Sequence, residues 1–409
     1  MSERLLLVIN CGSSSLKFGL FRNGSLFDEN GLHCLAEGIA EALASDSALL
    51  KCRFNDVEQL HELPGANHQQ ALEMLLGILE PRFTLSATLQ GIGHRVVHGG
   101  ELFSGSILIT PEVKAQIESC VPLAPLHNPA NLLGIELLAK FFPKLPQVAV
   151  FDTAFHQTMP PEAYIYALPY HLYEKHGVRR YGFHGTSHRY VTLEAARYLD
   201  KPKDQINLVT AHLGNGASVT AERNGQSVDT SMGMTPLEGL VMGTRCGDVD
   251  AGIFSFLIEQ GETPESVRKM FNQDSGLLGI SGVSQDMRTL CAEADNGNYR
   301  CQLAIDVFCS RLAKYIAAML SSLPHCDALV FTGGIGENAA VIREKTIARL
   351  GIFGYRLDTE LNEQTDAEIS VISRNLSPLI LVIKTDEEKM IAQDTRNLIG
   401  DNHPAGNSR

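Results

Sequence analysis

Short apolar runs of strand length recur along the chain and alternate with segments of helical periodicity. The runs are LLLVI at 5–9, QVAVF at 147–151, INLVTAHL at 206–213, DALVFTGG at 327–334 and PLILVIKT at 378–385. Between several of them, apolar residues recur every three or four positions, most clearly in 129–142 and 301–323. Buried strands that alternate with helices predict an α/β fold.

Two of these strands open segments with the same local pattern. Asn10-Cys11-Gly12 follows the first run and precedes a second strand, whereas His212-Leu213-Gly214 follows INLVTA and precedes ASVTAERNG. Both pairs of equivalent positions are 202 residues apart. The pattern favours two halves that each begin with a strand, a tight turn and a strand, although glycine turns are common enough for chance similarity to produce it.

Length and charge narrow the class of protein. A chain of 409 residues is expected to form two domains, and 44% apolar with 20% charged residues is typical of a globular protein. The net charge of -13, without a basic cluster, argues against nucleic-acid binding. Nine cysteines without a CxxC pair argue against disulfides and zinc, and no run approaches a membrane span, so we expect a cytoplasmic protein.

Three glycine-rich segments follow predicted strands, at 12–15, 214–216 and 333–336. Glycine lets backbone N–H groups approach phosphate oxygens closely. The first segment, with Lys17 after it, does not fit the Walker pattern of two glycines framing four residues. Any one segment fits an ordinary turn, but three together favour a nucleotide held by two lobes, with the third turn opening a helix at 339–351.

Two arginines, Arg95 in GIGHRVVHGG and Arg245 in VMGTRCGDVD, lie in apolar, glycine-rich surroundings. A guanidinium group can hold a carboxylate or phosphate through two hydrogen bonds, and glycine leaves room for a small anion. A salt-bridged arginine is the alternative. His184 and His188 have the spacing of a zinc helix but lack its glutamate, so we expect a hydrogen-bond donor to a phosphoryl group in preference to a metal ligand.

Two carboxylates follow predicted strands. Asp152 ends QVAVFD, and Glu387 lies in TDEEK after LILVIKT. Oxygen ligands at strand ends suit Mg²⁺ that bridges nucleotide phosphates. Helix capping explains TDEE equally well.

The motifs together resemble the acetate kinase family of short-chain carboxylate kinases. They are NCGSSSLKF, GHRVVHGG, PLHNP, FDTAFHQTMP, RRYGFHGTSH, HLGNGAS, DTSMGMTPLEGLVMGTRCGD, FTGGIGEN and EEKMIA, in this order from about residue 5 to 395. The family belongs to the sugar kinase, Hsp70 and actin superfamily. The resemblance implies an α/β fold of two duplicated actin-like, ribonuclease H-like domains with central mixed sheets and an interdomain nucleotide cleft. The expected domains are 1–152 with 386–409, and 153–385.

The resemblance also implies an activity: reversible transfer of the ATP γ-phosphoryl group to acetate, giving acetyl phosphate and ADP, with Mg²⁺ or Mn²⁺, by a homodimer. Arg95 and Arg245 would hold the carboxylate and the phosphoryl group, and His184 would stabilise the transferring oxygens. Asn10 and Glu387 would position the metal, and Lys17 would approach the nucleotide. Asp152 is assigned to acid/base catalysis in the family, but acetate is already ionised at neutral pH, so we expect Asp152 to orient Arg95 or His184.

Further residues would line the substrate sites. Val97 and His127 are expected near the alkyl group and carboxylate of the acid. The residues expected to bind the nucleotide lie in three motifs and are His212, Leu213, Gly214, Asn215, Gly216, Asp286, Met287, Arg288, Gly334, Ile335, Gly336, Glu337 and Asn338.

Two alternatives remain at this stage. A propionate or butyrate kinase would differ only in the alkyl pocket, where a methylene is worth about 1 to 3 kcal/mol. The branched side chain of Val97 favours acetate. A non-catalytic actin-like ATP-binding protein would use the glycine turns but would not need Arg95, Arg245 and His184 to converge.

Overall fold

The computed structural model describes residues 4–24, 31–55 and 57–400. The chain divides into two compact units, 1–154 with 386–409, and 155–385. We call these the first and second units. Residues 401–409, the end of the segment expected to join the N-terminal domain, lie outside the described residues.

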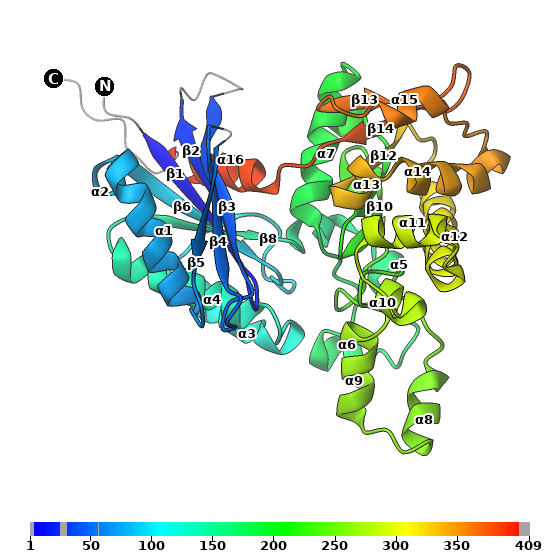
Figure 1. Ribbon diagram of the computed structural model, residues 1–409, viewed down its shortest axis with the longest axis horizontal. Coiled ribbons are helices and arrows are strands. Elements are labelled where there is room, and N and C mark those ends of the chain that lie inside the picture. Colours follow the sequence, from blue (N-terminus) through cyan, green and yellow to red (C-terminus); the bar gives the residue numbers. More distant parts are fainter. Residues whose placement is uncertain (1–3, 25–30, 56, 401–409) are drawn as a thin grey trace. The chain divides into compact units, whose positions relative to one another are not determined.

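The first unit contains an eight-stranded sheet in the order β5-β4-β3-β2-β1-β6-β8-β7 (Figure 1). Its strands are β1 Leu5–Cys11, β2 Leu16–Asn23, β3 Leu32–Glu41, β4 Leu49–Phe54, β5 Val57–Glu62, β6 Leu89–Val96, β7 Ile107–Leu108 and β8 Gln147–Phe151. Its helices are α1 His68–Phe83, α2 Leu85–Thr88, α3 Pro111–Ser119, α4 Asn128–Phe141 and α16 Glu387–Gly400, with a 3₁₀ turn at Val121–Leu123.

The second unit contains a six-stranded sheet in the order β11-β10-β9-β12-β14-β13. Its strands are β9 Leu208–Leu213, β10 Ala217–Arg223, β11 Gln226–Thr230, β12 Ala328–Thr332, β13 Ile369–Val371 and β14 Ile380–Ile383. Its helices are α5 Pro161–Tyr164, α6 His171–His176, α7 Gly185–Tyr198, α8 Gly252–Glu259, α9 Pro264–Gln273, α10 Gly276–Ser281, α11 Met287–Asp295, α12 Tyr299–Leu320, α13 Gly333–Asn338, α14 Ala340–Ile347 and α15 Thr359–Glu363. The 3₁₀ segments are Ala154–Thr158, Lys203–Gln205 and Ala348–Phe353.

The two sheets repeat one topology. In the first unit, β1 pairs antiparallel with β2, β2 antiparallel with β3, and β1 and β8 parallel with β6. The second unit repeats these pairings: β10 pairs antiparallel with β9 and with β11, and β9 and β14 pair parallel with β12. The predicted α/β class and the internal repetition are therefore confirmed, and the strands that carry Asn10 and His212 are the equivalent first strands.

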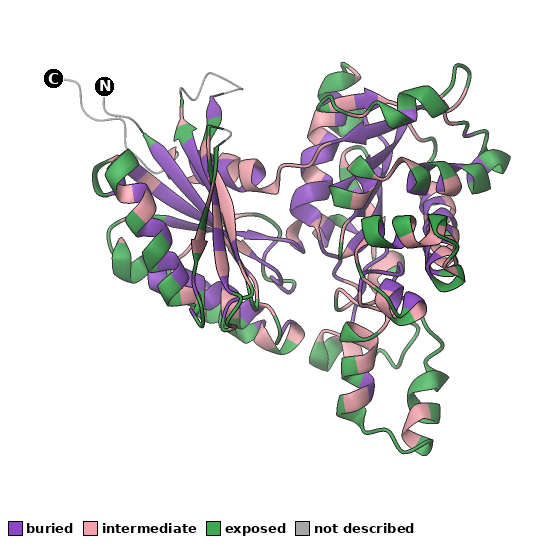
Figure 2. Cartoon of the chain, viewed as in Figure 1, coloured by how far each residue is buried: buried purple, intermediate pink, exposed green. Residues whose placement is uncertain are grey.

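The packing of strand β1 on both of its faces explains why its sequence is continuously apolar. Its odd-numbered residues, such as Leu7, pack in one cluster with Leu75 of α1 and Leu138 of α4. Its even-numbered residues, such as Val8, pack with Ile391 of α16. Because both faces are covered, the strand lacks the alternation of a half-exposed one. Figure 2 shows the same burial in the central strands of both sheets.

Helix α16 packs against β6 at a position that is glycine. A Cβ atom added to Gly93 would lie 2.4 Å from Thr395 Oγ1 and 2.6 Å from Ile391 Cγ2. No real side chain fits at such distances. Gly93 therefore lets α16 approach the sheet, which places the first residue of this helix, Glu387, near the ends of β1 and β6.

The third glycine segment differs from the prediction. We expected 333–336 to be a turn before a helix at 339–351, but 333–338 is itself the short helix α13. Gly333 has a φ of +75°, which favours glycine, and its N–H donates to Glu337 Oε1 at 2.8 Å. The Glu337 carboxylate thus closes the segment into a helical turn directly after β12.

Candidate active site

In the first unit, Arg95 and Asp152 form a bidentate ion pair at the ends of β6 and β8. Arg95 Nε donates to Asp152 Oδ1 at 2.8 Å, and Nη2 donates to Oδ2 at 2.6 Å. The Asp152 side chain is 1% exposed, against 21% for Arg95. Of the two partners we expected for Asp152, the structure gives it Arg95.

Two further predicted residues gather around this pair. Arg95 Nη1 lies 3.4 Å from Asn10 Oδ1, which accepts its hydrogen bond. Burial lowers the pKa of Arg95, but the charges of Asp152, Glu387 and Glu388 raise it more, so its pKa lies above the ordinary value. Arg95 is thus held as a fixed cation.

Glu387 has the chemistry of a cation ligand. Its Oε1 atom is buried and has no hydrogen-bond partner among the described residues. Burial raises the pKa of Glu387 to about 7; Arg95 and Lys17 oppose the increase, whereas Asp152 and Glu388 add to it. A buried acceptor without a donor is costly unless a cation completes it. Mg²⁺ prefers oxygen ligands, and the Glu387 carboxylate and the side-chain oxygen of Asn10 are oxygen ligands of this kind.

No cluster of three or more His, Cys, Asp or Glu side chains with the arrangement of a metal site occurs within the described ranges. Protein ligands would therefore provide only part of the coordination of such an ion. This is typical of Mg²⁺, which keeps water and binds phosphate oxygens as well.

The segment after β6 is fixed by α4. Asn131 Oδ1 accepts from the N–H of Val97 at 3.0 Å, and Asn131 Nδ2 donates to the carbonyl of Cys11 at 2.7 Å. Asn128 exchanges two hydrogen bonds with the backbone of His98. Val97 is buried, and the half-buried His127 directly precedes α4. The PLHNP motif identified His127, but the two asparagines that organise the segment were missed.

Lys17 lies opposite Asn10 in the β1–β2 pairing and is exposed. It lines a surface cavity of about 310 Å³ together with Glu37, Arg53 and Glu388. The NCGSSSLK segment is a hairpin, closed by a 2.8 Å hydrogen bond from Gly12 N to Ser15 O. A Walker loop leads from a strand into a helix, which explains why this segment does not match its pattern.

In the second unit, His184 and Arg245 converge on Gly216. A Cβ atom added to Gly216 would lie 3.2 Å from His184 Nε2 and 3.4 Å from Arg245 Nη1. His184 has a φ of +58°, uncommon for a residue with a side chain, and directly precedes α7. Such strain persists only where surrounding contacts impose it. The absence of a side chain at Gly216 leaves space beside an imidazole nitrogen and a guanidinium nitrogen.

Histidine and serine side chains fix the orientation of His184. Its Nδ1 lies 3.0 Å from Ser218 Oγ, and its ring lies 4.3 Å from that of His212. His212 Nδ1 in turn lies 2.8 Å from Ser187 Oγ. The His184–His188 spacing therefore has a use other than zinc binding: both rings contact the hydroxyl group of Ser218.

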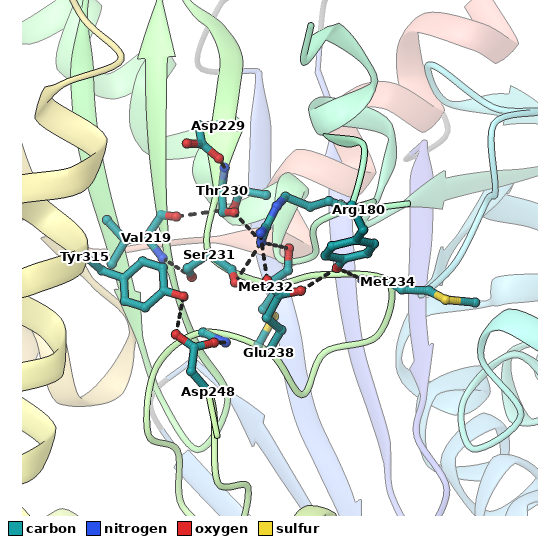
Figure 3. A network of polar contacts seen from close by, with 12 residues as sticks. Arg180, Val219, Asp229, Thr230, Ser231, Met232, Met234, Glu238, Asp248 and Tyr315 are labelled. Carbon is teal, nitrogen blue, oxygen red and sulfur yellow. Dashed lines mark hydrogen bonds and ion pairs between the residues drawn. The ribbon is translucent and has the colours of Figure 1, made fainter. Parts of the chain in front are cut away.

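The loop that carries Arg245 is anchored by Arg180. Figure 3 shows the contacts of Arg180 with residues 230–232 and with Glu238. Arg180 Nη1 donates to three consecutive carbonyls, of residues 230–232, at 2.9 to 3.2 Å. Its Nη2 pairs with Glu238 Oε1 at 2.7 Å, and Tyr166 bonds to the other oxygen of Glu238. Two residues before Glu238, the carbonyl of Pro236 accepts from Arg245 Nη1 at 2.9 Å. Arg180 and Glu238 were missed, although RRYGFHGTSH and TPLEGL contain them.

Three sequence segments line one cavity of about 660 Å³ in the second unit. The predicted residues at its wall are Gly214, Asn215, Asp286, Met287, Arg288, Gly334, Ile335 and Asn338, and Gln285 and Ala339 join them. His212, Leu213, Gly216, Gly336 and Glu337 belong to the same segments but do not line it. The volume is in the range of small-molecule and cofactor sites.

Glu337 is engaged inside the second unit. Its Oε1 accepts hydrogen bonds from the N–H groups of Gly333 and Thr385, at 2.8 and 3.0 Å. It therefore links α13 to the end of the segment that follows β14.

An anchored arginine in each unit, together with a histidine and a cavity of cofactor size in the second unit, suits a phosphotransferase. The sequence profile of the Acetokinase family matches residues 5–393, and the chain belongs to this family. It is similar to acetate kinase of Shewanella frigidimarina, with 49% identity over 98% of this chain and 99% of the relative. The family acts on a carboxyl group as phosphoryl acceptor.

Solved structures show the same similarity. The chain resembles a propionate kinase from Francisella tularensis, with a TM-score of 0.91 and 45% identity over 97% of this chain and 100% of that one. It also resembles Porphyromonas gingivalis acetate kinase, with a TM-score of 0.89 and 44% identity over the same shares. In the part of the chain that the structure describes, no helix is both long and apolar enough to cross a membrane.

Proposed function

We propose that the protein is an acetate kinase, which reversibly transfers the γ-phosphoryl group of ATP to acetate and forms acetyl phosphate and ADP. The observation that carries the proposal is the convergence of His184 Nε2 and Arg245 Nη1 beside Gly216, where a small anion would meet an imidazole ring and a guanidinium group. The transferring phosphoryl group carries its charge on three equatorial oxygens. Fixed donors that are already in place stabilise such charge most effectively.

Each unit, taken by itself, holds groups that suit this chemistry. In the first unit, Arg95 is held by Asp152 and would bind a carboxylate or phosphoryl oxygen. Both oxygens of Asp152 already accept hydrogen bonds from the Arg95 guanidinium group, so we assign it orientation of Arg95 and not proton transfer. Acetate, as an ionised nucleophile, needs no base.

Asn10 and Glu387 would hold Mg²⁺, for which Mn²⁺ can substitute. When bound, the ion would neutralise phosphate charge. The cavity lined by Gly214, Asp286 and Gly334 would hold the nucleotide, and Lys17 would approach its phosphates. We propose direct in-line attack of the acetate oxygen on the γ-phosphorus, in which the new O–P bond forms as the bond to ADP breaks.

Propionate is the second candidate substrate because the similar Francisella tularensis protein is described as a propionate kinase. Val97, which is buried and fixed by Asn131, is the candidate wall of the alkyl pocket. Its branched side chain would crowd a longer acid, so we favour acetate. From the resemblance we also propose a cytoplasmic location and a homodimer. Light scattering would test the homodimer.

The deciding experiment measures ADP formation with acetate, propionate and butyrate, and traps the acyl phosphate with hydroxylamine. We expect the highest kcat/KM with acetate and a large loss in Arg95→Ala and Arg245→Ala. A higher kcat/KM with propionate would make propionate the substrate. Wild-type activity in both variants would contradict the proposed anion site. A folded preparation that binds ATP but forms no acyl phosphate would instead identify a non-catalytic ATP-binding protein.

A further inference from the structure

A continuous chain of buried polar groups leads from the interior of the second unit to His184. It starts at Glu222 in β10 and passes through Thr210 in β9, His188 in α7 and Ser218 in β10. These four residues are 0% exposed. The proposed chemistry uses none of them, and burial of so many polar groups is costly unless each is paired.

Each link of this chain has hydrogen-bond length. Glu222 Oε1 lies 2.7 Å from Thr210 Oγ1, which lies 2.7 Å from His188 Nδ1. His188 Nε2 lies 2.8 Å from Ser218 Oγ, which lies 3.0 Å from His184 Nδ1. The second oxygen of Glu222 contacts the Thr192 hydroxyl group. The chain therefore joins a buried carboxyl group to the ring nitrogen of His184 that faces away from Gly216.

The buried groups at the far end are neutral near pH 7. Burial raises the pKa of Glu222 to about 8, and the hydroxyl groups of Thr192 and Thr210 only partly offset this increase. Burial also lowers the pKa of His188 well below its usual value, with further lowering from His156 and His212. His156 itself bonds to Ser227 and to the Phe183 carbonyl.

Because each of these groups carries one proton, all hydrogen bonds of the chain must point in the same direction, from donor to acceptor. A hydroxyl group has one proton to donate, and a neutral imidazole has one N–H. If Glu222 Oε1 carries a proton, it donates to Thr210, Thr210 to His188 Nδ1, His188 Nε2 to Ser218, and Ser218 to His184 Nδ1. The proton of His184 is then on Nε2. If Glu222 is ionised, or carries its proton on Oε2, then Thr210 donates to Oε1, every donor reverses and the proton of His184 is on Nδ1.

We propose that Glu222, Thr210, His188 and Ser218 form a relay that holds His184 as the Nε2–H tautomer, with a donor facing the space beside Gly216. The Thr192 hydroxyl group lies within hydrogen-bond reach of two acceptors, Glu222 Oε2 and, at 2.7 Å, the carbonyl oxygen of His188. The proposed direction requires its one proton to be donated to Glu222 Oε2, so that Oε1 carries the acid proton. The inference rests on the proposed function, because a donor at that position is useful only if an anion occupies it. The four relay members are positioning residues that act through His184.

Two threonines that face each other across β9 and β10 provide the test. Thr210 and Thr220 are register partners, and both are 0% exposed. Thr220 Oγ1 bonds to Thr230 at 2.9 Å and lies outside the relay. Thr210→Val and Thr220→Val therefore remove the same hydroxyl group from neighbouring positions, and only the first interrupts the relay. Ser218→Ala removes the last link and provides a second interruption with little change of volume.

The tautomer is measured by long-range ¹H–¹⁵N correlation on ¹⁵N-histidine protein at pH 7, with the His184 signal assigned by its loss in His184→Asn. We expect Nε2–H in the wild type and in Thr220→Val, and a shift toward Nδ1–H in Thr210→Val and Ser218→Ala. In the two interrupted variants kcat should fall about 10- to 100-fold, as for other groups that orient a functional histidine. Glu222→Gln, whose amide can donate where the acid did, should keep Nε2–H.

An Nδ1–H signal from His184 in the wild type would overturn the relay. The relay would also be overturned if Thr210→Val had the same His184 signal and the same kcat as Thr220→Val. The spectrum does not depend on turnover. A wild-type protein with Nε2–H on His184 but no acyl phosphate formation would therefore overturn the proposed function alone.

Discussion

Arg95 and Asp152 contact each other through two hydrogen bonds, at 2.8 and 2.6 Å, and these engage both oxygens of a carboxylate that is almost fully buried. A carboxylate used as a general base must reach the reacting proton. Asp152 instead directs both oxygens at the guanidinium group, so its effect on catalysis should be to fix the position of Arg95.

Asp152→Asn should therefore lower kcat/KM for acetate by about 100-fold, the cost typical of a misplaced binding group. The shape of the pH–rate profile between pH 6 and 9 should stay unchanged. Asp327→Asn is a matched control, because Asp327 is also largely buried and pairs with Lys201 at 2.5 Å. It should affect stability but not kcat/KM. Loss of one limb of the pH profile in Asp152→Asn would assign proton transfer to Asp152.

Gly216→Ala should weaken the anion site without weakening the fold. Its Cβ would lie 3.2 Å from His184 Nε2 and 3.4 Å from Arg245 Nη1, so one of these side chains must move. We expect KM for acetyl phosphate to rise about 10-fold or more, because displaced donors bind the anion less well. Thermal unfolding should change little. Gly351→Ala, where an added Cβ meets nothing within 4 Å, is the control. Unchanged KM in Gly216→Ala would place the anion elsewhere.

The sequence carried enough information for the class of fold and the repeated topology, for physical reasons. Central strands such as β1 and β9 are buried on both faces, so they appear as continuous apolar runs. The outer strands β4 and β5 have mixed burial, which leaves no such signal, and they were missed. The helical form of 333–338 was also missed, because it depends on the bond from Gly333 to Glu337.

For the site, the residues that carry chemistry were easier to predict than those that hold them. Arg95, Asp152 and His184 stood out because their types suit anions and lie next to glycines or strand ends. Asn131, Ser218 and Arg180 bond to partners 30 or more residues away in sequence. Only the folded chain brings such partners together, so spacing alone gave no reason to choose these three residues.

Arg180→Lys tests how the loop of Arg245 is held. A lysine ammonium keeps the charge but cannot bond to three carbonyls and Glu238 together, because it lacks the planar fork. We expect a loss of about 1 to 3 kcal/mol in stability of the second unit, and a raised KM for acetate as Arg245 loses its fixed position. Arg197→Lys, in an exposed pair with Glu194, should change neither quantity. Lower stability with unchanged KM would show that the anchor does not act through Arg245.

Glu387→Gln tests the proposed metal ligand. The amide keeps the shape of the side chain but removes the charge that would bind Mg²⁺, and Asn10 alone cannot replace it. We expect the Mg²⁺ concentration for half-maximal activity to rise about 10-fold or more, while direct Mn²⁺ binding measured by electron paramagnetic resonance weakens in parallel. Glu388→Gln, the neighbouring carboxylate, is the control and should have a smaller effect. Equal effects of the two variants would indicate a general electrostatic contribution of this acidic segment.

The buried acid Glu222 should make the stability of the second unit depend on pH. Its pKa is raised from 4.5 to about 8, so the folded protein keeps a proton that the unfolded chain loses. The stabilisation is complete below pH 4.5 and is lost as pH rises through 8, at about 1.4 kcal/mol per pH unit for one proton. Compared with Glu222→Gln, which does not titrate, the wild type should therefore lose relative stability between pH 5 and about 8 and then stay level. Calorimetric melting of both proteins at pH 5.5, 7 and 8.5 measures this difference. A constant difference across the three pH values would mean that Glu222 does not change its protonation on unfolding, and that it enters the fold already ionised.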